Sequence, residues 1–281
     1  MFLRLNKPGR DVPLAVLVPN MLTTLALCSG LASIHYVLLE QWERSLAAIV
    51  LAGIFDVLDG LAARLLRVQS RFGAVLDSLS DFLAFGVAPA LIIHQWVLAE
   101  PTRRFDDTLG LVAVMTFAIC SAMRLARYTA NLGPVPTPRE AREQKPKARG
   151  SIFFTGMPTP AGAGAVLVPA FLLASGAIAW RPPDWAVAAY TLVIALLMVS
   201  RVPMFALKGV RVPRKYAVLP LVLLVVLMAL MIRRPWLTLA GLAGVYVLTI
   251  PWAVALHARR KREQPAETAG RVTPHAGQEP V

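Results

Sequence analysis

The stretch DVLDGLAARLLRVQSRFGAVLDSLSD, residues 56–81, carries four aspartates at fixed spacing: Asp56, Asp59, Asp77 and Asp81. It lies within segments apolar enough to sit in a membrane, where an ionised carboxylate costs about 2.5–3.5 kcal/mol on insertion scales. Four unpaired carboxylates would cost about 10 kcal/mol, which is comparable to the stability of a whole domain. Because Arg64 alone cannot neutralise four negative charges, the sequence predicts bound cations, most simply divalent metal ions.

The spacing also predicts how the four carboxylates meet. Residues three or four apart on a helix lie about one turn apart, so each pair of aspartates shares a face. The connection around 64–71 is short and basic, which predicts an antiparallel hairpin with both pairs at similar depth. Four carboxylates converging from two helices can bridge two divalent cations, and oxygen ligands favour Mg²⁺, Mn²⁺ or Ca²⁺ over softer metals.

The composition is that of an integral membrane protein. Of 281 residues, 57% are hydrophobic and 16% are charged, whereas soluble domains have about 25% charged residues. The apolar residues form blocks long enough to cross a bilayer as helices. We therefore predict an all-α, polytopic helix bundle with about eight transmembrane helices, near 17–39, 45–66, 72–98, 108–131, 159–180, 185–205, 215–233 and 236–257.

The basic residues predict the orientation of these helices. With the N-terminus in the cytoplasm, 23 of the 29 Lys and Arg residues fall on the cytoplasmic side and six on the other. This asymmetry predicts an even number of helices with both termini cytoplasmic. The basic face would attract the anionic headgroups of membrane lipids, which accounts for the net charge of +13 without nucleic acid as a partner.

Four regions follow along the chain. Residues 1–16 are expected to form a cytoplasmic N-terminal arm, and residues 17–205 a helical core containing the aspartates. Residues 206–258 would add two C-terminal transmembrane helices, and residues 259–281, which lack any hydrophobic pattern, a disordered cytoplasmic tail.

Three further residues of the stretch fit a ligand site, although each has a structural alternative. Gly60 and Ala63 share the face of the first aspartate pair, where their small size admits a flat ligand or, alternatively, a neighbouring helix. Arg64 lies one turn beyond Gly60 and could clamp a phosphate, or it could extend to the lipid headgroups. The combination is more specific than its members, because eight positions in 26 residues form the skeleton D-x2-D-G-x2-A-R-x8-G-x3-D-x3-D.

This skeleton resembles the signature of the CDP-alcohol phosphotransferases at every fixed position. Softer motifs resemble the bacterial-type phosphatidylserine synthases within that family, namely VPNMLTTLALCSG at 18–30, LDSLSDFLAFGVAPA at 76–90, CSAMRLARY at 120–128 and FFTGMPTPAGA at 153–163. The resemblance implies a six-helix core followed by two C-terminal helices. It also implies transfer of the phosphatidyl group from CDP-diacylglycerol to the hydroxyl of L-serine, at a cytoplasmic site in the cell (inner) membrane.

The resemblance further implies roles for individual residues. Asp56, Asp59 and Asp77 would ligate two metal ions, Mg²⁺ or Mn²⁺, and Asp81 would act as general base while also touching a metal. The CDP site would be lined by the small and basic residues of the signature and its flanks: Gly60, Ala63, Arg64, Ser70 and Gly73. A homodimer is a further expectation.

Two polar pairs outside the stretch are also candidate binding residues. Asn20 and Thr23 of the first apolar block could bind the nucleotide, or could hydrogen-bond between helices. Arg124 and Arg127, three residues apart at the cytoplasmic end of the fourth block, could bind the serine carboxylate or a lipid phosphate. Positive-inside anchoring is the alternative for both arginines.

Other functions remain open at this stage. The same transfer could use a phosphorylated acceptor such as glycerol 3-phosphate or an inositol phosphate, with a basic pocket drawn from Arg201 to Lys215. Intramembrane acidic clusters also mark ion pathways, so a divalent-cation transporter is the alternative from another class. Against it, the fixed Gly, Ala and Arg have no evident use in a pathway for metal alone.

Overall fold

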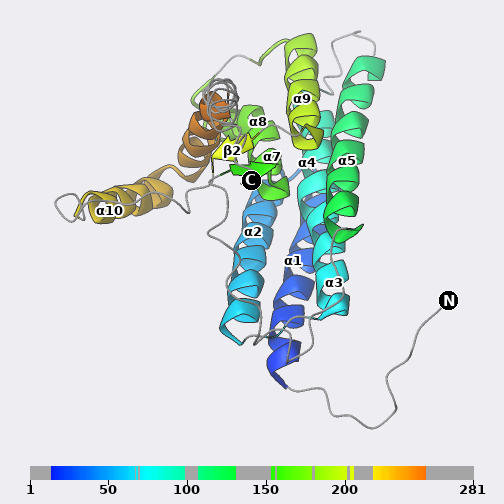
Figure 1. Cartoon of the computed structure of the whole chain (residues 1–281). Coiled ribbons are helices and arrows are strands. Elements are labelled where there is room, and N and C mark those ends of the chain that lie inside the picture. Colours follow the sequence, from blue (N-terminus) through cyan, green and yellow to red (C-terminus); the bar gives the residue numbers. More distant parts are fainter. Residues whose placement is uncertain are drawn as a thin grey trace, which may run out of the picture.

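The computed structural model describes residues 14–66, 68, 70–98, 107–130, 153–155, 157–178, 181–200, 203–205 and 218–250. The predicted N-terminal arm and C-terminal tail lie outside these ranges, except that the first helix begins at Leu14. The described chain is mainly helical, which confirms the all-α class. The helices stand side by side as a bundle in Figure 1.

Four helical segments are long and apolar enough to cross a membrane. They are Leu17–Leu38, Trp42–Leu65, Arg71–Leu98 and Thr108–Ala130, close to the first four predicted spans. A helix of 24 residues is about 36 Å long, more than the roughly 30 Å of bilayer hydrocarbon. The first two segments lie in α1 (Leu14–Leu38) and α2 (Trp42–Leu65), and the fourth lies in α5 (Asp107–Ala130).

Helices α1 and α2 form an antiparallel hairpin through a three-residue turn. Glu40 has a positive φ of 55°, the left-handed conformation that commonly ends a helix. Its N–H donates to the Val37 carbonyl at 3.0 Å, and the N–H of Gln41 donates to the Tyr36 carbonyl at 2.9 Å. These two bonds satisfy the last free carbonyls of α1 and reverse the chain into α2.

The third span is not a uniform α-helix. It consists of α3 (Arg71–Asp81), the π-helical segment η1 (Phe82–Val87), α4 (Ala88–Ile92) and a second π-helical segment η2 (Ile93–Leu98). Pro89 lies in the first turn of α4 and has no N–H to donate. The N–H of Ala88 instead reaches back five residues to the carbonyl of Leu83, as in a π-turn.

The predicted span 159–180 is divided into α7 (Thr159–Val166) and α8 (Val168–Ala174). Pro169 follows the break, so the Ala165 carbonyl four residues earlier receives no backbone N–H from it. The hydroxyl of Tyr190 donates to that carbonyl at 2.6 Å. Tyr190 belongs to α9 (Asp184–Val199), so a side chain of α9 supplies the hydrogen bond that the break leaves missing.

The remaining described elements are short. Strand β1 (Phe153–Thr155) pairs antiparallel with β2 (Pro203–Phe205), an addition that the sequence did not predict. Two apolar helices follow in the C-terminal region, α10 (Val218–Arg233) and Pro235–Ile250, within the two predicted C-terminal spans. Figure 1 shows α10 projecting from the bundle, and none of its residues is buried.

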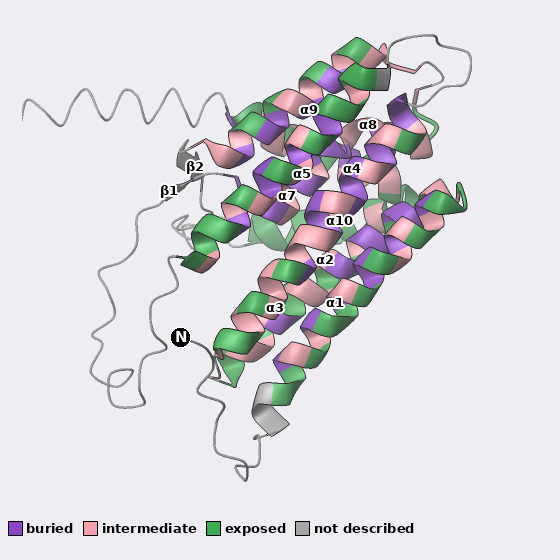
Figure 2. Ribbon diagram, turned by 90° about the vertical axis from the view of Figure 1, so that its right-hand side faces the viewer, coloured by how far each residue is buried: buried purple, intermediate pink, exposed green. Residues whose placement is uncertain are grey.

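The core lies between the helices, and the apolar surface faces outward. Leu46 of α2, Ile92 of α4, Phe117 of α5 and Ile194 of α9 are all fully buried members of one cluster. Figure 2 shows exposed residues along the outer faces of the helices and buried residues between them. Many of the exposed residues are large and apolar, which suits a lipid environment rather than water. The length and apolarity of the four long helices, together with the apolar residues on their outer faces, identify an integral membrane protein.

Candidate active site

Two antiparallel helices carry the acidic cluster. Helix α2 ends at Leu65 and α3 begins at Arg71, so the two aspartate pairs face each other across a short connection. Ser70 starts α3 as its N-cap, with its side-chain oxygen accepting a hydrogen bond from the N–H of Gly73 at 2.9 Å. This cap satisfies one of the free N–H groups at the start of the helix and fixes where α3 begins relative to α2.

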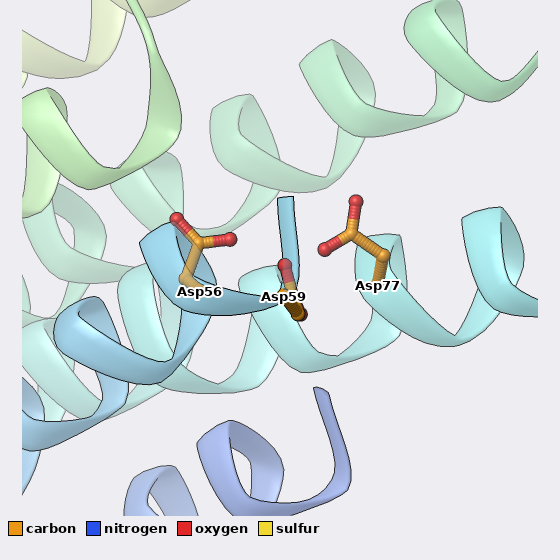
Figure 3. A group of neighbouring side chains, drawn as sticks. All are labelled: Asp56, Asp59 and Asp77. Atoms are coloured by element: carbon orange, nitrogen blue, oxygen red, sulfur yellow. The ribbon is translucent and has the colours of Figure 1, made fainter. Parts of the chain in front are cut away.

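Three of the four predicted metal ligands converge. One carboxylate oxygen from each of Asp56, Asp59 and Asp77 lies within 4.8 Å of the others. Figure 3 shows Asp56 and Asp59 extending from α2 and Asp77 from α3 toward a common space. Asp59 is buried, and the other two are partly buried. Three like charges held this close repel one another unless a cation lies among them.

The donor set of this triad fits a divalent metal ion. Every donor is a carboxylate oxygen, the type of ligand that hard cations such as Mg²⁺ and Mn²⁺ prefer. The ligands come from two helices that both pack against α1, so they are brought together by the fold. The triad is therefore a candidate metal-binding site in the described part of the chain.

The fourth aspartate lies beside the triad rather than within it. Asp81 ends α3, one turn after Asp77. Its carboxyl group is within hydrogen-bonding reach of the Asp56 carboxyl group. The structure thus brings all four aspartates into one neighbourhood, with three forming the candidate metal site and Asp81 at its edge.

The predicted residues of the CDP site fall into two groups. Gly60 borders open space: a Cβ added there would meet no atom within 4 Å. In the described chain, therefore, no neighbouring helix packs against this glycine. Ala63 is partly buried, and Arg64 is exposed in the last turn of α2. These three residues leave the helix face beside the triad accessible.

Asn20, Ser70 and Gly73 form the second group. A Cβ at Gly73 would lie 2.8 Å from Asn20 Oδ1 and 2.9 Å from Ser70 Oγ. The absence of a side chain at residue 73 thus lets the polar groups of Asn20 and Ser70 approach the backbone of α3. The structure thus brings Asn20 of the first apolar block next to Ser70 and Gly73 of the aspartate stretch.

The hydroxyl of Thr23 contacts the acidic cluster directly. Its Oγ1 lies 2.6 Å from Asp59 Oδ2 and 3.0 Å from the Pro19 carbonyl oxygen. Of the two alternatives for Thr23, nucleotide binding or a hydrogen bond between helices, the structure contains the second, and the partner is a candidate metal ligand.

The two predicted arginines have different surroundings. Arg124 is partly buried, donates from Nη1 to the hydroxyl of Thr159, and lies within electrostatic range of Asp81. Arg127 is exposed and donates to the Val199 carbonyl at 3.2 Å, at the C-terminal end of α9. Positive groups stabilise helix C-termini, so the contact of Arg127 is structural. Arg124 also has a partner in Thr159, and it is the arginine that interacts electrostatically with Asp81.

Sequence reasoning missed two residues of this neighbourhood. Thr159 lies in the quoted motif FFTGMPTPAGA, but nothing in that motif reveals its contact with Arg124, 35 residues away. Tyr246, on the helix Pro235–Ile250, lies within electrostatic range of Arg124. No local pattern distinguishes this tyrosine. The stacking of Trp236 on Phe171 of α8, with ring centroids 6.2 Å apart, holds its helix against the bundle.

Comparison with known proteins gives one consistent family. Residues 16–199 match the family model described as CDP-alcohol phosphatidyltransferase. A protein of Mycobacterium leprae named CDP-diacylglycerol–serine O-phosphatidyltransferase is 34% identical over 87% of this chain and 76% of its own length. The protein of the same name from Mycobacterium tuberculosis is 35% identical over 87% of this chain and 80% of its own. A Helicobacter pylori protein with that name is 29% identical over 83% and 88%, respectively.

Proposed function

Because this chain belongs to the CDP-alcohol phosphatidyltransferase family, we propose that it transfers the phosphatidyl group of CDP-diacylglycerol to L-serine, giving phosphatidylserine and CMP. The observation that carries the proposal is the carboxylate triad within 4.8 Å, next to the open face at Gly60. The relatives named above supply serine as the acceptor. The enzyme is a phosphotransferase of phospholipid biosynthesis.

Asp56, Asp59 and Asp77 would hold the divalent cations, for which we propose two ions, Mg²⁺ or Mn²⁺. When bound, such ions neutralise charge on a pyrophosphate and on the leaving phosphate oxygen. The open face at Gly60 gives the nucleotide room beside α2. Arg64, exposed one turn further, is positioned to donate to a phosphate oxygen. Asn20, Ser70, Ala63 and Gly73 complete the proposed lining of the CDP site.

Asp81 is the proposed general base. The serine hydroxyl oxygen forms a bond to the β-phosphorus, and the bond from that phosphorus to the CMP oxygen breaks. The proton of the hydroxyl passes to the Asp81 carboxylate. Arg124 interacts electrostatically with Asp81, so a serine carboxylate held by this arginine would have its hydroxyl near the base. Arg127, with its hydrogen bond to α9, would lie outside the site and support the packing of α5 against α9.

We place this site on the cytoplasmic side of the cell membrane, with both termini in the cytoplasm. The distribution of Lys and Arg supports that orientation. The proposed core comprises residues 17–205, followed by two additional helices within 206–258. The exposed apolar surface of α10 leaves room for a homodimer in the bilayer.

The test is release of CMP by the purified protein in lipid nanodiscs. CDP-diacylglycerol is supplied with Mn²⁺ or Mg²⁺ and with L-serine, glycerol 3-phosphate or inositol 1-phosphate in turn. We expect release that depends on both serine and metal. Release with another acceptor would retain the family chemistry and replace the proposed acceptor. No release with any acceptor, together with metal flux in vesicles, would favour cation transport.

A further inference from the structure

Thr23 lies where α1 meets both helices of the acidic cluster. Its side chain is 4% exposed, and its Oγ1 is 2.6 Å from Asp59 Oδ2 on α2. Its backbone carbonyl accepts a hydrogen bond of 3.3 Å from the Ser80 hydroxyl on α3. One residue of α1 therefore contacts the helix of Asp59 through its side chain and the helix of Asp77 through its backbone.

The Thr23 hydroxyl has one proton and two acceptors. The alternative acceptor, the Pro19 carbonyl, is 3.0 Å away. A hydrogen bond to an ionised carboxylate is shorter and about twice as strong as one between neutral groups. The contact with Asp59 is the shorter of the two, so we assign the proton to it. The Pro19 carbonyl retains the backbone N–H of residue 23 as its ordinary helical donor.

Close packing of α1 holds this donor in position. A Cβ at Gly30, two turns further along α1, would lie 3.0 Å from the Ala84 Cα. The backbones of α1 and η1 are thus close together, which restricts movement of α1 relative to the third span. Because both the donor and its helix are fixed, the hydrogen bond restricts the orientation of the Asp59 carboxylate.

We propose that Thr23 is a positioning residue for the metal centre, which orients Asp59 by holding its Oδ2 and leaves the remaining lone pairs for the cation. The inference rests on the proposed function in taking the acidic cluster as a divalent-cation site. It assigns Thr23 to the metal ligand rather than to the nucleotide. Removing such an outer hydrogen bond typically weakens metal affinity by about 10- to 100-fold.

The adjacent residue supplies a matched control. Thr24 also donates its hydroxyl to the carbonyl four residues earlier, that of Asn20, at 2.8 Å. Thr24 is exposed, however, and its hydroxyl donates to a backbone carbonyl rather than to a carboxylate. Replacing either threonine by valine keeps the side-chain shape and removes one hydroxyl that lies within hydrogen-bonding distance of a carbonyl four residues earlier. Only the change at residue 23 affects the contact with Asp59.

The experiment measures Mn²⁺ binding by the full-length protein in nanodiscs, using electron paramagnetic resonance without any substrate. We expect Thr23→Val to weaken Mn²⁺ binding by about 10-fold or more, and Thr23→Ser, which keeps the hydroxyl, to stay within about threefold of the unsubstituted protein. Thr24→Val should bind Mn²⁺ normally. If Thr23→Val does not fold, Thr23→Cys replaces it, because a thiol is a weak donor.

Unchanged Mn²⁺ affinity in Thr23→Val, or equal losses in Thr23→Val and Thr24→Val, would overturn the inference. A raised KM for CDP-diacylglycerol with unchanged Mn²⁺ affinity would assign Thr23 to the nucleotide instead. Because binding is measured without substrate, the result stands even if the protein proves not to use serine. Conversely, serine-dependent CMP release with normal Mn²⁺ binding in Thr23→Val would support the function and reject the positioning role.

Discussion

Arg124 of α5 donates a hydrogen bond to the hydroxyl of Thr159, the first residue of α7. This contact joins a helix of the long-span bundle to the shorter helices that follow it. It also leaves the arginine within electrostatic range of Asp81. The hydrogen bond to Thr159 restrains the guanidinium group before any substrate arrives, so less conformational freedom is lost when a carboxylate binds to it.

The two arginines at the end of α5 should therefore respond differently to substitution. We expect Arg124→Ala to lower kcat/KM for serine by at least about tenfold, because a charged hydrogen-bond donor is lost at the acceptor site. Arg127→Ala should leave kcat/KM nearly unchanged and cost about 0.3–1 kcal/mol of stability, since this arginine interacts with the C-terminus of α9. Initial rates at varied serine concentration, with thermal unfolding of both variants, measure the difference.

Equal losses of kcat/KM in the two variants would mean that the arginines act through general surface charge. Arg124→Lys refines the comparison further, because lysine keeps the charge but cannot form the planar, two-pronged contact with a carboxylate.

Alanine substitutions at Gly60 and Gly30 should distinguish a glycine that borders space for a ligand from one that allows two helices to pack closely. A methyl group at Gly60 meets no atom within 4 Å, whereas one at Gly30 would lie 3.0 Å from the backbone of Ala84. We expect Gly60→Ala to unfold at the same temperature as the unsubstituted protein but to raise KM for CDP-diacylglycerol by about 10-fold, if the nucleotide fills this space. Gly30→Ala should instead lower stability by about 1–3 kcal/mol through overpacking.

Thermal unfolding and kinetics of the two alanine variants provide the measurement. A normal KM for CDP-diacylglycerol in Gly60→Ala would mean that the nucleotide does not bind at this face of α2.

Local sequence spacing predicted the acidic cluster well. The four aspartates lie on two adjacent helices with a short connection, so their approach depends on helical periodicity and one turn. The first four apolar spans were also predicted closely, since length and hydropathy are sufficient to identify them. The structure then distinguished the triad from Asp81, which requires side-chain geometry that spacing alone does not give.

The contacts around the cluster could not be predicted in the same way. Thr23 and Asp59 are 36 residues apart, and Arg124 and Thr159 are 35 apart. Each contact depends on how separate helices pack, and threonine is common in membrane helices for other reasons. The break after α7 did have a visible signal, because Pro169 lies inside the apolar block and cannot donate a backbone hydrogen bond.

The separation of Asp81 from the triad leads to a third prediction. Asp81→Asn should lower serine-dependent CMP release by about 10²- to 10⁴-fold, the usual contribution of a general base, while Mn²⁺ binding persists. Asn substitutions at Asp56, Asp59 or Asp77 should weaken Mn²⁺ binding itself. Chelation with EDTA should abolish activity of the unsubstituted protein, and added Mn²⁺ or Mg²⁺ should restore it.

Electron paramagnetic resonance and CMP release on the same preparations distinguish the two classes of aspartate. Loss of Mn²⁺ binding in Asp81→Asn would place this residue among the metal ligands, and its loss of activity would then no longer support a separate role as general base.

The hydrogen bond from Tyr190 to the Ala165 carbonyl, 2.6 Å long, should matter because Pro169 leaves that carbonyl without its helical donor. Tyr190→Phe should therefore lower stability by about 1 kcal/mol with little effect on activity. In Pro169→Ala the backbone N–H of residue 169 is restored and can bond to the same carbonyl. The Tyr190→Phe substitution should then cost less in that background, as a double-mutant cycle of unfolding free energies would measure. An equal cost in both backgrounds would mean that the Tyr190 hydroxyl acts independently of the missing N–H at residue 169, and that it does not compensate for the break between α7 and α8.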